Sequence, residues 1–125
     1  MPRNPPEKQA RVVVCLFDLA VWTLKTTNRF PRNHRVTLGD RMDALVLDMA
    51  LQAHQASFRK DKTHLLWKLS EDLESFRILS RIAVELGCLQ GRQCEYAARQ
   101  IADIGRQLGG WIKQQEGLTA REDKR

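Results

Sequence analysis

The chain has 125 residues, with 21 Lys and Arg against 15 Asp and Glu, so its formal net charge is +6 at pH 7. This length suits one ordinary domain and excludes a second core of comparable size. The positive charge favours anionic partners, namely nucleic acid, an acidic protein or a membrane surface. No secretory signal pattern opens the chain, and the longest nearly uncharged stretch, residues 12–24, is too short to span a bilayer. We therefore expect a cytoplasmic protein that does not enter membranes.

Four segments repeat apolar residues at the i, i+3, i+4 spacing of an amphipathic helix. They cover residues 7–28, 38–57, 66–86 and 92–113, and the third is expected to end at Gly87, a typical helix stop. No alternation typical of strands occurs. The connections are short, so the pattern predicts an all-α fold, an antiparallel up-down-up-down four-helix bundle over residues 7–113. We expect the Pro-rich start, residues 1–6, and the charged tail, residues 114–125, to be disordered.

A basic joint, residues 29–41, separates the first two helical segments. Pro31 disfavours helical backbone in the residue before it, so the first helix should stop just before Pro31. Thr37, followed three residues later by Asp40, resembles a capping box and predicts the start of the second helix. The joint carries three arginines that are candidates for anion contacts: Arg32, Arg35 and Arg41.

The sequence offers no candidate catalytic residue, metal site or cofactor site. The three histidines lie in different segments without Cys, Asp or Glu at ligand spacing, and no phosphate-binding glycine loop or nucleophile elbow occurs. We interpret the three cysteines, Cys15, Cys88 and Cys94, as small core residues. The acidic cluster of residues 71–74 is predicted to face solvent, where Asp72 would pair with Lys68.

The basic residues of the fourth segment recur at a regular interval. Arg92, Arg99, Arg106 and Lys113 are each one heptad apart, and a helix drifts only about 20° per heptad, so they form one slowly turning stripe. Arg77 and Arg81 are i, i+4 neighbours on the third segment and form a second short row. Arg59, Lys60 and Lys62 cluster at the opposite connection. Two interpretations stay open: a surface that tracks phosphates, or ordinary solvated charges neutralised by Glu95 and Asp103.

The fourth segment also contains glycines that weaken a helix. Gly105 and Gly109 each cost up to about 1 kcal/mol relative to alanine, which is justified where another chain segment must approach closely. They are candidate contact points, although Gly109 and Gly110 could equally mark a bent or fraying helix end. Trp111 fits best as a packing residue. Apolar residues on more than one side of the second and fourth helices favour self-association.

Several of these motifs together resemble the accessory variability determinant (Avd) of diversity-generating retroelements. The resemblance covers about residues 12–113 and rests on residues 30–35 and 38–41, residues 73–81, Tyr96, and residues 104–112, which contain the Gly-Arg-x-Leu-Gly-Gly-Trp ending. The wider group of four-helix-bundle proteins includes those encoded by intervening sequences in large-subunit ribosomal RNA genes. The Gly-Arg ending points to the retroelement branch.

The resemblance implies a small basic bundle without catalysis that assembles into a homopentameric barrel. It further implies binding of the element's reverse transcriptase and of nucleic acid, both template RNA and cDNA, in support of mutagenic cDNA synthesis that diversifies a target gene. Arg77, Arg81 and Arg106 match arginines of the family pattern. Because aromatic residues suited to base stacking are scarce in the sequence, we expect nucleic-acid binding to be largely sequence-independent. The alternative is an assembly protein of the intervening-sequence group whose basic face meets an acidic protein and no nucleic acid.

Overall fold

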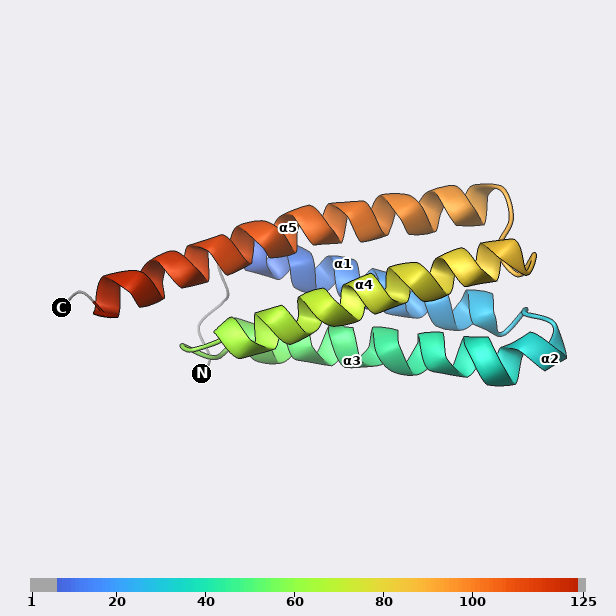
Figure 1. Ribbon diagram of the computed structural model, residues 1–125, viewed down its shortest axis with the longest axis horizontal. Coiled ribbons are helices and arrows are strands. Elements are labelled where there is room, and N and C mark those ends of the chain that lie inside the picture. Colours follow the sequence, from blue (N-terminus) through green and yellow to red (C-terminus); the bar gives the residue numbers. More distant parts are fainter. Residues whose placement is uncertain (1–6, 124–125) are drawn as a thin grey trace.

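The computed structural model describes residues 7–123, and the side chains of residues 11–121. Four long helices, α1 (Glu7–Thr27), α3 (Asp40–Ser57), α4 (Thr63–Glu85) and α5 (Arg92–Asp123), run antiparallel to their neighbours in a four-helix bundle (Figure 1). A short helix, α2 (Arg32–His34), and a π-helical turn, η1 (Arg35–Gly39), precede α3. No strand occurs in the described part of the chain. The predicted all-α bundle is confirmed.

Each long helix packs against two others around one apolar core. The packed pairs are α1 with α3, α3 with α4, α4 with α5, and α5 with α1. Residues at helical spacing, such as Leu16 and Leu19 on α1, are completely buried, as are Phe76 on α4 and Ile104 on α5. Burying a side chain of this size contributes about 1.5–3 kcal/mol. The apolar faces therefore supply the main force that holds the helices together.

The joint between α1 and α3 differs from the predicted cap. As expected, α1 ends before Pro31, but the helix resumes at Arg32, where the Pro31 carbonyl accepts from the backbone N–H groups of His34 and Arg35 at 2.9 Å each. The predicted capping box at Thr37 and Asp40 is wrong, since the Thr37 hydroxyl donates to the Asn33 carbonyl at 3.2 Å inside an existing turn. Pro31 is the N-cap residue of α2, with φ of −51° and ψ of 141°, a position that suits proline because it has no N–H to satisfy.

The joint packs its apolar residues against α1. Gly39 is buried at the end of η1, and a Cβ at this position would lie 3.4 Å from Cβ of Thr27 and 3.6 Å from the Phe30 ring. Phe30 is 5% exposed and belongs to the core. The apolar members of the joint are therefore structural and fix how α1 turns into α3.

The end of α4 follows the sequence prediction. Gly87 has φ of 75°, the Gly87 N–H donates to the Val84 carbonyl at 3.0 Å, and the Cys88 N–H donates to the Ala83 carbonyl at 2.8 Å. These two bonds form a Schellman motif, which needs a residue with positive φ just after the helix. The glycine therefore terminates α4 as its position predicted.

The last helix is longer than predicted. The expected disorder from residue 114 is not found, because α5 continues to Asp123 and leaves the bundle at its far end (Figure 1). Gln115 is buried, and its amide donates to the Lys60 carbonyl at 3.3 Å, which ties this extension to the α3–α4 loop. The expectations for residues 1–6 and 124–125 lie outside the described residues.

Two predictions about polar and sulfur side chains need correction. Asp72 does not face solvent with its acidic neighbours but is 6% exposed, where it accepts from the Gln52 amide of α3 and from the Lys68 ammonium, both at 3.0 Å. The pairing with Lys68 is confirmed. The cysteines are free thiols, but they are half-buried at the margin of the core rather than inside it.

Candidate nucleic-acid interface

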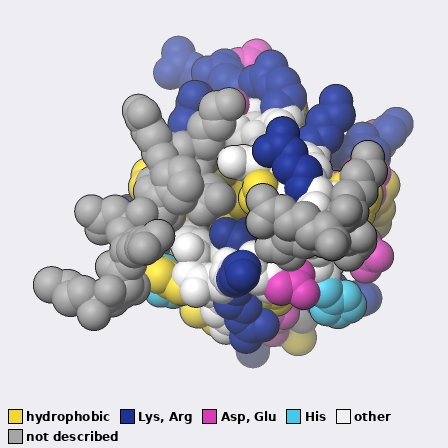
Figure 2. All heavy atoms as spheres, turned by 90° about the vertical axis from the view of Figure 1, so that its left-hand side faces the viewer, with side chains coloured by type: hydrophobic (Ala, Val, Ile, Leu, Met, Phe, Trp, Pro, Cys, Tyr) yellow, Lys and Arg dark blue, Asp and Glu magenta, His cyan; other side chains and the backbone are white. Residues whose placement is uncertain are grey.

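The basic stripe on α5 is exposed along its whole length. Arg92, Arg99, Arg106 and Lys113 all have exposed side chains. At 1.5 Å per residue the stripe extends about 32 Å, with about 10 Å between successive members. Figure 2, which views the bundle from the end where α5 leaves it, shows Lys and Arg side chains gathered on the α5 side. The stripe can therefore face several phosphates of one nucleic-acid strand.

Acidic residues neutralise the stripe only in part. Asp103 lies 3.4 Å from the Arg106 guanidinium and 3.8 Å from that of Arg11. Asp103 does not pair with Arg99, which lies four residues before it on the same helix. Within residues 11–121, Arg92, Arg99 and Lys113 have no carboxylate within 4.0 Å. Exposed ion pairs contribute little, so even Arg106 can exchange its partner for a phosphate.

The two arginines of α4 differ in their surroundings. The Arg77 guanidinium donates to both carboxylate oxygens of Glu74, and these hydrogen bonds raise the pKa of Arg77 and lower that of Glu74. Arg81 is exposed and, in the described part of the chain, has no ion pair. Because α4 and α5 are neighbours, these arginines lie on a helix adjacent to the stripe.

The loop residues lie at both ends of the bundle. Arg32, Arg35 and Arg41 are exposed at the joint, which shares an end with the α4–α5 connection (Figure 1). At the other end Arg59 and Lys60 are exposed. The two groups of loop residues lie at opposite ends of the bundle, so they do not form one patch with each other.

Lys62 does not join the predicted basic cluster of the α3–α4 loop. It is 8% exposed, and its ammonium lies 5.3 Å from the centre of the Trp111 ring. Burial lowers the pKa of Lys62. Lys62 is thus a packing residue, and its cation–π contact helps to hold Trp111 in place.

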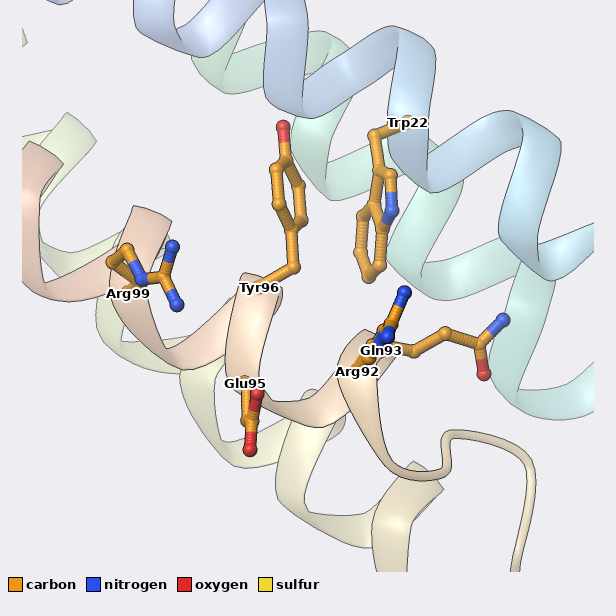
Figure 3. Close-up of a pocket in the computed structure, with 6 residues that line it drawn as sticks. All are labelled: Trp22, Arg92, Gln93, Glu95, Tyr96 and Arg99. Atoms are coloured by element: carbon orange, nitrogen blue, oxygen red, sulfur yellow. The ribbon is translucent and has the colours of Figure 1, made fainter.

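An open groove of about 410 Å³ between α1 and α5 adjoins the start of the stripe. Its lining residues are Trp22, Arg92, Gln93, Glu95, Tyr96 and Arg99 (Figure 3). The rings of Trp22 and Tyr96 lie 4.8 Å apart between centroids and are tilted by 39°. The pKa of Tyr96 is raised by burial, and further by Asp18 and Cys15.

Sequence reasoning did not find this groove. Trp22 follows the apolar period of α1, which assigned it to the core, and it is in fact half-buried at the core margin. Tyr96 lies 74 positions later in the chain, and nothing in the sequence places the two rings side by side. The available signal was local: Tyr96 lies between Arg92 and Arg99 on one helix.

The candidate packing residues also differ from one another. Trp111 is 4% exposed and lies in the core. A Cβ at Gly105 would meet Leu73 of α4 at 3.7 Å, an ordinary contact, and one at Gly109 would meet nothing within 4 Å. The helix continues through Gly105, Gly109 and Gly110 to Asp123, so these glycines do not mark the end of α5. Nothing in the described part of the chain requires glycine at position 109.

Among residues 7–123 no three His, Cys, Asp or Glu side chains lie where they could hold a metal ion. In the same part of the chain no helix is both long and apolar enough to cross a membrane.

Comparison with known proteins identifies the family. No curated protein matches the sequence significantly. The sequence matches the model of the bAvd-like family over residues 12–115, which contain α3 and α4 completely and most of α1 and α5. Such proteins are accessory and non-catalytic. Because the match spans most of the chain, this protein belongs to the bAvd-like family, the Avd-like proteins of diversity-generating retroelements.

Proposed function

We propose that this chain is a non-enzymatic accessory protein of a diversity-generating retroelement that binds template RNA or cDNA and the element's reverse transcriptase, and so supports mutagenic cDNA synthesis. The observation that carries the proposal is the α5 stripe, four exposed cations at heptad spacing of which three have no ion pair among the described residues. Contacts of this kind release condensed counterions from the phosphate backbone and are sequence-independent.

A pull-down tests the proposal. The tagged chain is co-expressed with the reverse transcriptase from the same element and recovered with or without nuclease treatment. We expect the polymerase to be retained in both cases, and RNA only without nuclease. Retention of an acidic protein with no RNA in either case would favour the alternative, in which the basic surface meets protein alone.

We further propose that the chain assembles into a homopentamer. The outward side of α1 is apolar, with Val14, Phe17, Val21 and Leu24 38–63% exposed. Its neighbour α3 adds Leu47 and Leu51, which are 43% and 59% exposed. Contiguous exposed apolar surface of this kind is typical of interaction sites.

A second exposed apolar face supports a closed ring. Trp67 and Ile78 of α4 are 49% and 47% exposed and follow one helix face. Two different apolar faces on one chain fit a heterologous contact, which generates rings when the rotation closes. Size-exclusion chromatography with light scattering measures the mass directly. A monomer at micromolar concentration would contradict the assembly, whereas Phe17→Ser should dissociate a true oligomer into folded subunits.

A further inference from the structure

The groove between α1 and α5 adds two features to the stripe, an aromatic surface and a gap beside it. Trp22 of α1 and Tyr96 of α5 both line the groove and are neither fully exposed nor fully buried. Their rings lie close together but tilted, at 4.8 Å and 39°, so they form a stepped apolar surface (Figure 3). A planar aromatic group can extend such a stack.

Two arginines of α5 flank the aromatic pair. Arg92 and Arg99 are one heptad apart, so their Cα atoms are separated by about 10 Å with Tyr96 between them. In Figure 3 both guanidinium groups lie on the side of the rings, while the Glu95 carboxylate points away from them. Within residues 11–121 neither arginine has an ion pair. The groove therefore presents an apolar centre with a cation on either side.

We propose that this groove binds one unpaired nucleotide of a single strand, with the base stacked on Trp22 and Tyr96 and the flanking phosphates on Arg92 and Arg99. The inference rests on the proposed nucleic-acid function and adds a preference for single strands. In a duplex the faces of the bases are already stacked, so only an unpaired base can occupy the ring surface. Every base has such a face, so the site tolerates any sequence.

The test compares single-stranded with duplex binding by fluorescence anisotropy. The probes are a labelled oligouridine, its deoxy counterpart and a duplex of the same length. Tyr96→Leu keeps apolar bulk but removes the ring, whereas Tyr96→Phe keeps a stacking surface. We expect Tyr96→Leu to weaken single-strand binding about tenfold and to leave duplex binding unchanged, and Tyr96→Phe to match the original chain. Equal losses for both probes, or none, would overturn the site.

Arg99→Ala distinguishes the ring contribution from the charge contribution. It should weaken both single-strand and duplex binding, because it removes a phosphate contact and no stacking surface. If the original chain binds no nucleic acid at low salt, the proposed function fails. If it binds with equal affinity after Tyr96→Leu, only the stacking site fails. Equal affinity for the ribose and deoxyribose probes would support a groove that contacts base and phosphate alone. If either probe binds equally well before and after Tyr96→Leu, a site built on the stacked base is overturned.

Crosslinking examines the chain without substitutions, in case a variant folds poorly. An oligonucleotide carrying 5-iodouracil is irradiated on the full chain in its native assembly, and the crosslinked peptide is mapped by mass spectrometry. We expect adducts at Trp22 or Tyr96. Adducts confined to residues outside the groove would contradict the proposal.

Discussion

Replacement of Gly109 by alanine should stabilise the folded subunit. The glycine lies inside a continuous 32-residue helix, is exposed, and has nothing within 4 Å of the place where a Cβ would be. Alanine therefore brings no clash with the described residues and removes the conformational freedom that glycine adds to the unfolded state. Host–guest values put the gain at about 0.8–1 kcal/mol. For a domain of this size that corresponds to a rise in Tm of roughly 3–6 °C.

The assay is urea unfolding followed by circular dichroism, at several protein concentrations, so that subunit stability and assembly can be separated. Gly117→Ala is a matched control, since it too would meet nothing within 4 Å and lies in the part of α5 beyond the core-facing residues. Both variants should stabilise the subunit similarly. If Gly109→Ala destabilises the dilute subunit, the reasoning about α5 is wrong. If it stabilises the subunit but weakens assembly, a second copy approaches α5 at this glycine.

Three further predictions concern stability. Trp111→Ala should lower the free energy of unfolding by about 3–5 kcal/mol, because it empties a core position. Trp111→Phe should cost much less, since the indole N–H has no hydrogen-bond partner among the described residues. Equal losses for the two variants in urea titrations would contradict this. Asp72→Ala should lower the free energy of unfolding by about 2–3 kcal/mol, because it leaves the Gln52 amide unpaired between α3 and α4. Lys68→Ala should cost far less, because its ion pair with Asp72 is exposed on the lysine side. A larger loss for the lysine variant would refute the role given to the bond between Gln52 and Asp72. Burial raises the pKa of Asp43, so the folded state binds this proton more tightly than the unfolded state and the contribution of Asp43 to stability falls as pH rises above about 3.8. Asp43→Asn, which can still accept from Thr27, should therefore raise stability at neutral pH, with a gain that shrinks toward pH 4; a gain independent of pH would point to another cause.

Helical periodicity carried most of the fold prediction. It placed the four long helices because a bundle needs one apolar face per helix, and the spacing of Leu16 and Leu19 or Leu69 and Phe76 displays that face directly. Gly87 marked a helix end because positive φ is needed there. These features are local, so the sequence shows them without knowledge of the neighbours.

The errors arose where distant segments decide. The extension of α5 has little apolar periodicity, and one anchor, Gln115 on the Lys60 carbonyl, comes from another loop. Asp72 looked solvent-facing because its partner Gln52 is on another helix. The joint contains two patterns that can start a helix, Pro31 and the Thr37–Asp40 pair. The helix begins at Arg32, directly after Pro31, so Thr37 already lies inside a helical turn.

The candidate site also has one part that the sequence predicts and another that depends on how the helices pack. The α5 stripe could be predicted because its four members share one helix and one interval. The groove could not, because Trp22 and Tyr96 come together only when α1 packs beside α5. Whether an arginine such as Arg106 is free or paired also depended on where Asp103 points.

The most direct measurement of the central claim is the salt dependence of RNA binding. Filter binding of a structured RNA across a salt series gives the slope of log affinity against log salt concentration, which is about −0.7 per phosphate contacted on a single strand and about −0.9 on a duplex. We expect a steep negative slope. For Arg99→Ala the magnitude of the slope should fall by the amount that corresponds to about one phosphate contact. Arg59→Ala, an exposed arginine at the far loop, should leave the slope unchanged. Affinity that does not depend on salt, or binding absent at low salt, would contradict a phosphate-binding surface on α5.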